Sequence, residues 1–333
     1  MPTMRAIGSY QGLPVDDRES LLNIEVPVPE LRPHDILVRV QAVSVNPADV
    51  KVRAGLESSR TPRILGFDAA GRVEAIGSEV TTLAVGDEVY YAGDITRAGS
   101  NAEFQAVDER LVARKPVSLS YAEAAALPLT AITAWETLFE HFRLTSESTG
   151  PLLVMGGAGG VGSMAVQLAK ALTAVPVLAS ASRPESRKWI EELGADAVVD
   201  HHDLLTTTRA VAPDGVAYVL SPFTRGNIEA YAEILRPFGH ITAIDEPEGL
   251  ELLPLKSKSI SWHWEFMFTR SMHQTADMIE QKRLLERVSG LIDEKRITTT
   301  VTRVIDDFSA AGIREAHRLV ETGHVTGKVV VSR

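Results

Sequence analysis

The stretch LLVMGGAGGVGSMAVQLAKALTA, residues 152–174, decides the fold of the chain. An apolar run typical of a buried strand leads into a glycine cluster, after which apolar residues recur at the spacing of one helix face. Gly157, Gly159 and Gly162 form a G-x-G-x-x-G pattern between strand and helix, the context in which this pattern binds the pyrophosphate of a dinucleotide. We expect Gly157 to permit the tight turn, Gly159 to let the pyrophosphate approach, and Gly162 to let the helix pack closely on the strand. The residues expected to contact the dinucleotide are Gly157, Ala158, Gly159, Gly160, Val161 and Gly162.

The second strand of the expected unit, Val177–Ser180, indicates which dinucleotide binds. An NAD site usually ends this strand in an acid that holds the ribose diol. Here Ser180, Ser182 and Arg183 follow, with no carboxylate before Glu185. Hydroxyls and a guanidinium suit a 2′-phosphate, so the pattern favours NADPH. The alternative is that Ser182 and Glu185 form a capping box for the next helix.

Further strands and helices alternate after the glycine loop and predict a doubly wound parallel sheet. Strands are expected at 197–200, 217–221, 240–244 and 259–264. Because ligands bind at the carboxyl ends of such strands, Ile244 and Asp245 should lie beside the nicotinamide ribose.

The segments on either side of this region have a different sequence pattern. Residues 1–125 show short alternating strands, among them Ile36–Val45 and Ile64–Glu74, separated by glycine turns, and they suggest a barrel. An alanine-rich helical segment begins at Tyr121, with a break expected at Pro128. The tail returns to strand character after a helix over 276–295. We therefore expect a β-rich domain over 1–125 and 273–333, with the nucleotide-binding domain of 126–272 inserted into it.

Composition excludes several classes of protein. The 333 residues carry a net charge of −10, which disfavours binding to a nucleic-acid backbone. There is no cysteine, so disulfides and thiolate metal sites are excluded. No apolar run approaches the ~18 residues of a membrane span, and the first residues do not resemble a signal peptide. These features predict a cytoplasmic protein that does not bind a membrane.

Several motifs together resemble those of a known family. The chain is similar to the medium-chain dehydrogenase/reductase superfamily, in its zinc-free quinone oxidoreductase branch, and within that branch to proteins described as zinc-type alcohol dehydrogenase-like. Besides the glycine loop, the stretches that carry the resemblance are NPADVK (46–51), ILGFDAAG (64–71), VGDEV (85–89), GSNAEF (99–104), AALPLTAITA (125–134) and WHWEFMFTRS (262–271).

The resemblance implies a GroES-like β-barrel domain, a Rossmann domain, and hydride transfer from NADPH to a quinone or an α,β-unsaturated carbonyl compound. Zinc-dependent relatives carry cysteine, histidine and cysteine where this chain has Asn46, Phe67 and, near the third position, Thr130. Zinc needs several nitrogen, sulfur or oxygen ligands around a tetrahedron, so we expect no metal. The resemblance also implies a homodimer through pairing of the sixth strand.

Candidate catalytic residues follow from the resemblance and from the chemistry. Reduction of an enone leaves an enolate-like charge that needs a hydrogen-bond donor and then a proton. Asn46 is the first candidate, with a role in an Asn-Pro turn as its alternative. Lys51, where some relatives have a tyrosine, would supply a proton or positive charge unless it is only a solvated lysine. Tyr91 would reach the substrate unless it packs in an aromatic core.

Three other residues are assigned by the resemblance. Phe67 would offer an apolar wall to a planar substrate. Thr130 would lie near the nicotinamide or its phosphates, or else act as a cap or buried hydroxyl. Lys328 would contact the cofactor or only end a strand. Two alternatives to an NADPH-dependent reductase remain. One is a non-catalytic NADPH-binding protein, crystallin-like or redox-sensing, and the other is a zinc alcohol dehydrogenase.

Overall fold

The structure is a computed structural model that describes residues 2–333. The chain forms two compact units. The first runs to Ile132 and resumes over Phe268–Arg333, and the second is Thr133–Met267. Helix α2 (Tyr121–Ala125) packs on strands of the first unit, and the change of unit at Ile132 falls after the expected residue 125 because the chain beyond α2 also bonds to this unit, through the amide of Leu129 and Asp68.

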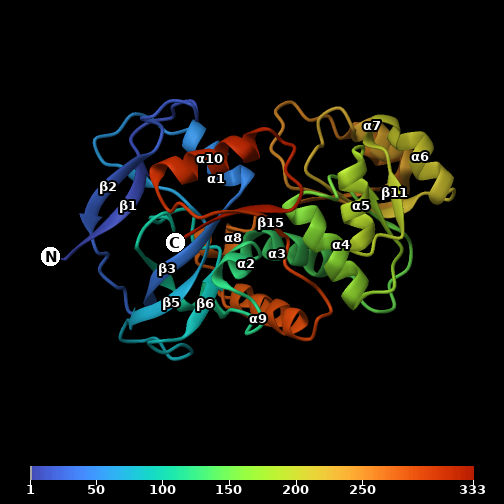
Figure 1. The fold of residues 1–333 in the computed structure, drawn as a ribbon. Helices are drawn as coiled ribbons and strands as arrows, with labels where there is room; N and C mark the ends of the chain where they lie inside the picture. The colour runs from blue at the N-terminus through green and yellow to red at the C-terminus, as the bar shows by residue number, and fades with distance from the viewer. Residues whose placement is uncertain (1) are drawn as a thin grey trace. The chain divides into compact units, whose positions relative to one another are not determined.

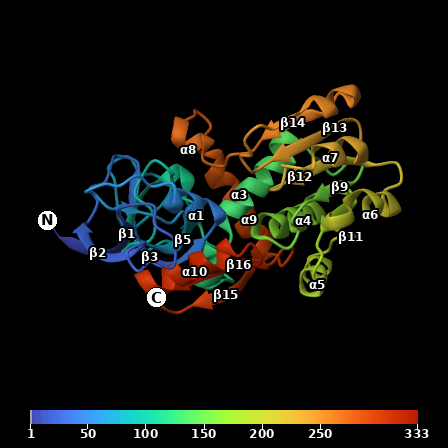
Figure 2. The ribbon, with the colours of Figure 1, turned by 90° about the horizontal axis from the view of Figure 1, so that it is seen from above.

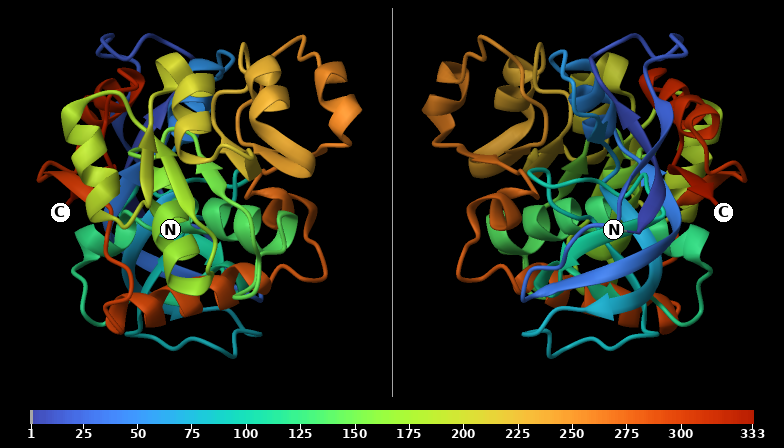
Figure 3. Two further views of the ribbon diagram at one scale, coloured as in Figure 1. Left: turned by 90° about the vertical axis from the view of Figure 1, so that its right-hand side faces the viewer. Right: turned by 90° about the vertical axis from the view of Figure 1, so that its left-hand side faces the viewer.

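The second unit contains a six-stranded parallel sheet in the order β11-β10-β9-β12-β13-β14. Counted from β9, this is the order 3-2-1-4-5-6 of a Rossmann fold. Figure 2 shows β9, β12, β13 and β14 side by side, and the left view of Figure 3 shows helices on both sides of the strands. The elements are η2 (Glu136–His141), β9 (Leu152–Val154), α4 (Gly160–Leu172), β10 (Val177–Ser180), α5 (Pro184–Glu192), β11 (Ala197–Val199), η3 (His201–Asp203), α6 (Leu204–Val211), β12 (Val216–Ser221), α7 (Ile228–Ile234), β13 (Leu235–Ala243), η4 (Leu253–Lys258) and β14 (Ser261–Trp264).

The first unit contains two sheets. One has three strands in the order β2-β1-β4, and the other has seven, in which β3 pairs with β5 along one edge and with β7 and β16 along the other. Figure 1 shows α10 (red) lying beside α1 (blue). The elements are β1 (Thr3–Ser9), β2 (Leu22–Pro27), β3 (Asp35–Val45), α1 (Pro47–Ala54), β4 (Arg63–Ile64), β5 (Asp68–Ile76), β6 (Glu88–Tyr91), β7 (Phe104–Asp108), η1 (Glu109–Leu111), β8 (Ala113–Arg114), α2, α8 (Thr269–His273), α9 (Glu280–Asp293), β15 (Val301–Ile305), α10 (Ala310–Glu321) and β16 (Lys328–Ser332).

The expected fold class is confirmed: an α/β chain with a GroES-like β-rich unit and a parallel Rossmann sheet. In the first unit a core of fully buried aliphatic side chains, among them Ile36, Val38 and Val40 of β3, lies between the sheets and α10. Strand β3 is buried along nearly its whole length, with only Arg39 and Gln41 partly exposed, so the alternation in Ile36–Val45 does not correspond to a strand with one exposed face.

The expected strand Ile64–Glu74 is wrong as a single element. It is divided into β4 and β5 by a turn at Gly66, whose φ is +96°. A Cβ at Gly66 would lie 2.5 Å from the hydroxyl oxygen of Ser100, so the turn packs against a distant segment of chain. Glycine alone fits this conformation and this spacing.

The helical segment from Tyr121 ends and restarts where proline predicts a break. Helix α2 ends at Ala125, and α3 (Pro128–Trp135) begins at Pro128. Proline is favoured at a helix start because its missing N–H would have no partner there.

Helix α10 was not expected, although Ser309 caps it through its hydroxyl, which accepts from the amides of Ala311 and Gly312. A serine before an apolar helical pattern is a start signal that was present in the sequence.

Candidate functional site

The glycine turn between β9 and α4 is shaped by close backbone approaches. The left-handed residue is Gly156, with φ +64°, so the tight turn expected at Gly157 lies one residue earlier. A Cβ at Gly157 would lie 2.7 Å from Cβ of Ala179 on β10, so Gly157 instead permits close packing on the neighbouring strand. A Cβ at Gly162 would lie 2.4 Å from the carbonyl oxygen of Gly156, as expected for close helix–strand packing.

Helix α4 begins at this turn with amides that can bind an anion. Its N-cap is Gly159, which has no capping side chain. The amides of Gly160, Val161 and Gly162 are in the first turn, where a helix offers no acceptor of its own. A turn in which only Ala158 and Val161 carry side chains, lined by such N–H groups, fits the pyrophosphate of a dinucleotide.

The end of β10 holds the predicted phosphate-binding residues in different environments. Ser180 is buried, and its hydroxyl accepts a hydrogen bond from the amide of Gly156 at 2.8 Å. The structure therefore gives Ser180 a role in fixing the glycine turn, while its contact with a cofactor stays a prediction. Ser182 is half-buried and Arg183 is exposed. Nη2 of Arg183 donates to the hydroxyl of Ser186 at 3.1 Å.

The alternative role for Ser182, in a capping box, is not what the structure shows. The N-cap of α5 is Arg183, whose side chain makes no capping hydrogen bond. Ser182 lies one residue too early to accept from the amides of the first turn. Ser182 and Arg183 thus follow β10 without a carboxylate before the exposed Glu185.

Ile244 and Asp245 lie at the carboxyl end of the sheet, directly after β13. The carboxylate of Asp245 accepts hydrogen bonds from the amide and the hydroxyl of Thr224, both at 2.8 Å. The amide of Ile244 donates to the carbonyl of Ser221 at 3.0 Å. A Cβ at Gly156 would lie 3.1 Å from the ring of Phe223, so the loops after β9, β12 and β13 meet at one sheet edge.

A second constellation lies inside the first unit. Nδ2 of Asn46 donates to Asp68 at 2.9 Å, and the ammonium of Lys328 donates to the side-chain oxygen of Asn46. The same ammonium donates to the carbonyl of Val45 at 3.0 Å and lies 3.4 Å from Asp68. Asp49 accepts from the amide of Asn46 at 2.8 Å. We call Asn46, Asp49, Asp68 and Lys328 the buried polar network, because all four are at most 4% exposed.

Burial sets the protonation of the buried polar network. The pKa of Asp49 is raised from 3.8 to about 7, mainly by burial and also by the charge of Asp68, while the hydrogen bond from the backbone amide of Asn46 and the charge of Lys328 oppose the shift. Burial also raises the pKa of Asp68 and lowers that of Lys328. The amide of Leu129 donates to the second oxygen of Asp68 at 2.7 Å. The network is electrically neutral when Asp49 carries a proton.

The network changes how Asn46 and Lys328 are understood. Both ends of the Asn46 amide and the Lys328 ammonium are engaged with partners inside the same unit. The structure gives these two residues a structural role, and their predicted contacts with substrate and cofactor stay predictions. Asp49 and Asp68 were missed, although two acids in an otherwise buried pattern and a lone lysine in the tail were visible in the sequence.

The other predicted residues are placed as follows. Tyr91 is fully buried in the core, its hydroxyl has no partner among residues 2–333, and burial raises its pKa. The burial of Tyr91 favours the core-packing alternative, and its predicted catalytic role stays a prediction. Thr130 is buried and donates to the carbonyl of Leu127 at 2.9 Å. Phe67 is buried with its ring centroid 4.7 Å from that of Phe268. Lys51 is exposed on α1.

The residues present do not fit a zinc ion. Within the described part of the chain, no group of three or more histidine, cysteine, aspartate or glutamate residues could hold a metal. At the position of Asn46 the buried polar network already contains a cation, the ammonium of Lys328, hydrogen-bonded to the amide. Zinc needs several nitrogen, sulfur or oxygen ligands arranged as a tetrahedron, which the described residues around Asn46 do not supply.

Known protein families and proteins match this chain along almost its whole length. The family "Alcohol dehydrogenase GroES-like domain" matches residues 32–119, and "Zinc-binding dehydrogenase" matches residues 193–331. A zinc-type alcohol dehydrogenase-like protein of Staphylococcus aureus (strain Mu50) is 40% identical over 99% of this chain and 100% of its own length. An NADPH-dependent alkenal/one oxidoreductase from Arabidopsis thaliana chloroplasts is 39% identical over 58% of this chain and 50% of its own length.

Two solved structures are similar to this chain over its full length. A protein of Rhizobium etli CFN 42, assigned as a zinc-dependent alcohol dehydrogenase, has a TM-score of 0.97 and 46% identity, covering 100% of this chain and 99% of its own. The quinone oxidoreductase of Coxiella burnetii has a TM-score of 0.82 and 26% identity, covering 100% of both chains.

These matches and the fold define an oxidoreductase of a known class. The chain belongs to the medium-chain dehydrogenase/reductase superfamily, in the zinc-free branch that includes the zinc-type alcohol dehydrogenase-like proteins and quinone oxidoreductases. Members of this superfamily bind nicotinamide cofactors. In residues 2–333, no helix combines the length and the apolar character needed to span a membrane.

Proposed function

We propose that this chain uses NADPH to reduce quinones or α,β-unsaturated carbonyl compounds without zinc. The observation that carries the proposal is that the glycine turn packs on the end of β10, the strand that leads directly into Ser182 and the exposed Arg183. An acid there would repel a 2′-phosphate, whereas a guanidinium can pair with it. The matches to an NADPH-dependent alkenal/one oxidoreductase and to a quinone oxidoreductase support the substrate class.

The chain's own residues would bind and orient the cofactor. The amides of Gly160, Val161 and Gly162 would hold the pyrophosphate, and Arg183 the 2′-phosphate. NADPH supplies a hydride, which adds to the β-carbon of an enone, and a proton then completes the reduction. Of the three predicted catalytic residues, Lys51 alone has an exposed side chain, so we propose it as the donor toward the developing oxygen charge.

The absence of zinc is part of the proposal. The protein of Rhizobium etli is assigned as zinc-dependent, so metal content needs its own measurement. We expect less than one tenth of an equivalent of zinc, by elemental analysis, in protein purified without chelator. One equivalent per chain, lost together with activity on dialysis against chelator, would overturn this part.

A second function, binding of NADPH without turnover, is favoured by one observation. Asn46 and Tyr91, two of the three predicted catalytic residues, are buried and cannot both present a polar group to a substrate without rearrangement. In that case Lys51 would be a solvated surface residue. Turnover with a substrate panel separates the two functions.

The experiment has a binding arm and a turnover arm. Fluorescence titration should give a lower Kd for NADPH than for NADH, and NADPH oxidation should follow with 1,4-benzoquinone, 9,10-phenanthrenequinone or a simple enone. Arg183→Ala should remove most of the preference for NADPH. Lys188→Ala is the matched control, since Lys188 is exposed on the same helix and pairs with Glu192. Equal Kd values for both cofactors in the wild type would contradict the phosphate site, and binding without turnover would favour the second function.

We also propose that the protein works in the cytoplasm, where reduced nicotinamide cofactors are available. There it would form a homodimer through the edge strand β14. Strand β14 is the last in its sheet, and Trp264 and Phe266 beside it are 52% and 41% exposed. Such aromatic residues at an unpaired edge suit an interface. Light scattering should give a dimer for the wild type and a monomer for Trp264→Glu; a monomeric wild type would refute it.

A further inference from the structure

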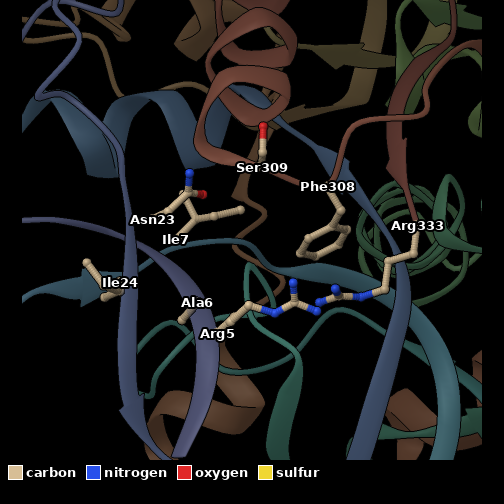
Figure 4. Close-up of a pocket in the computed structure, with 8 residues that line it drawn as sticks. All are labelled: Arg5, Ala6, Ile7, Asn23, Ile24, Phe308, Ser309 and Arg333. Atoms are coloured by element: carbon tan, nitrogen blue, oxygen red, sulfur yellow. The ribbon is translucent and has the colours of Figure 1, made fainter.

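A cavity of about 300 Å³ lies in the first unit, and none of its lining residues belongs to the glycine turn or the buried polar network. Figure 4 shows it between β1, β2 and the segment that leads into α10. Its apolar lining is formed by Ala6, Ile7, Ile24 and Phe308. A volume of this size is at the lower end of the range for small-molecule sites.

The polar lining of the cavity consists of hydrogen-bond donors. Figure 4 shows the guanidinium groups of Arg5 and Arg333 approaching each other below the ring of Phe308. The side-chain oxygen of Asn23 is already used, because it accepts from the amide of Ala310 at 2.9 Å. The amide nitrogen of Asn23 and the hydroxyl hydrogen of Ser309 remain as donors. Among the residues that line the cavity there is no acid.

Arg333 is held in a fixed orientation. Its Nε donates to the carbonyl of Val40 at 2.9 Å, and its Nη2 donates to the carbonyl of Ala102 at 3.1 Å. Its guanidinium carbon lies 4.0 Å from the centroid of the Phe308 ring. These contacts leave Nη1 with no acceptor among the described residues. Because the guanidinium is already ordered, a ligand that pairs with it loses little side-chain entropy.

Arg5 has a guanidinium without a side-chain partner in the described part of the chain. Two acids on neighbouring strands have other partners: Glu25, opposite Arg5 in the β1–β2 pair, accepts from the hydroxyl of Thr3, and Glu103 accepts from the backbone amide of Arg5 at 3.4 Å and lies 3.7 Å from Arg39. Two like charges that face one cavity repel each other, and an anion between them removes that repulsion. Burial lowers the pKa of Arg333, and the positive charges of Arg5 and Arg39 lower it as well, while the charge of Glu103 opposes the shift.

We propose that this cavity binds a small organic anion in which a carboxylate or phosphate group is joined to a planar or apolar body. The anionic group pairs with Arg5 and Nη1 of Arg333, and the body lies against Phe308, Ile7 and Ile24. Both arginines are exposed, so a ligand can enter from solvent. This site does not depend on the proposed reductase activity, because all of its residues are outside the cofactor-binding unit.

The probes are benzoate and phenyl phosphate, with benzamide as the neutral isostere of benzoate. Calorimetry on the full chain should show saturable binding of at least one anion and no binding of benzamide, and added salt should weaken it. The bound anion should also raise Tm. Whether phenyl phosphate or benzoate binds more tightly decides which anionic group the site prefers.

Two variants locate the site. Arg5→Gln should weaken anion binding about tenfold by removing one charge-assisted pair, without unfolding the chain, since Arg5 is an exposed strand residue. Arg60→Gln, at an exposed arginine outside the cavity, should bind as the wild type does. Binding that is unchanged in Arg5→Gln, equal binding of benzamide, or loss of binding in Arg183→Gln instead would overturn the proposal.

Discussion

The ammonium of Lys328 and the side-chain oxygen of Asn46 are joined by a hydrogen bond, although 282 residues separate them. At a position where zinc-dependent relatives place a metal ligand, this chain thus has a buried lysine whose charge is balanced by Asp68. The ion pair is inside the unit, with Asp68 fully buried and Lys328 4% exposed.

Lys328→Met should destabilise the first unit strongly. The substitution keeps the length of the side chain but leaves the Asp68 carboxylate buried without its counter-charge, which costs about 3–5 kcal/mol. Urea unfolding followed by a probe in the first unit would measure the loss. Lys295→Met, at an exposed lysine of the same unit, should change stability by less than about 0.5 kcal/mol. Equal stability of the two variants would show that the ammonium is not needed.

Asp49 should give stability a distinctive pH dependence. Its pKa in the folded chain, about 7, is above the value of 3.8 for an unperturbed carboxyl, so the folded state holds this proton more tightly than the unfolded state does. The contribution of the Asp49 proton to the free energy of unfolding is therefore fully present at low pH and is lost as the pH rises from about 4 to 7.

Asp49→Asn tests this dependence, because an amide oxygen can still accept from the amide of Asn46. Between about pH 5 and pH 8, the variant should gain stability relative to the wild type as the pH rises, when both are measured by denaturant unfolding. Glu57→Gln, at an exposed glutamate of the same unit, should run parallel to the wild type. A parallel curve for Asp49→Asn as well would mean that Asp49 ionises normally.

Comparing Ser180→Ala with Ser182→Ala should distinguish a serine that holds the shape of the glycine turn from one that contacts the 2′-phosphate of NADPH. Loss of the hydroxyl leaves the partly buried amide of Gly156 without its acceptor, at a cost of about 1 kcal/mol in stability, and cofactor binding should weaken in parallel. Ser182→Ala should weaken NADPH binding but leave Tm unchanged. The prediction fails if Ser180→Ala alters NADPH affinity with no change in Tm.

Gly162→Ala should abolish cofactor binding. The new methyl group would lie 2.4 Å from the carbonyl oxygen of Gly156, so the turn or the helix must shift. Gly290→Ala, inside α9 with nothing within 4 Å of the added carbon, should instead stabilise the chain by about 0.5–1 kcal/mol. Fluorescence titration with NADPH and thermal unfolding of both variants would check the contrast; tight binding by Gly162→Ala would contradict it.

The sequence predicted what depends on local patterns. The order of strands and helices around residues 152–264 follows from periodicity and turn residues, and the glycine loop was identified in its correct context. Within that loop, however, the left-handed residue is Gly156, because the contact with Ser180 on the neighbouring strand fixes the turn one residue earlier.

Features that depend on distant contacts were not predicted. The turn at Gly66 exists because a segment around Ser100 and Asn101 packs against it, and no local pattern in Ile64–Glu74 reveals that partner. Asn46, Asp68 and Lys328 were seen as separate candidates or not at all, since only the paired strands bring them together. The burial of Tyr91 was one of two alternatives that the sequence left open, because a tyrosine in an alternating strand can face either side.

Strand β3 pairs with β16 through residues Ala42–Val45 and Val329–Ser332, and this pairing has a consequence for biosynthesis. During translation the Rossmann sheet has all of its strands once residue 264 has left the ribosome, and it can fold then. The sheet of the first unit must wait for a strand made some 280 residues after its partner, with half of one edge of β3 unpaired in the meantime. Closing so long a loop is slow, and the open edge is a surface for mispairing that a chaperone would need to cover.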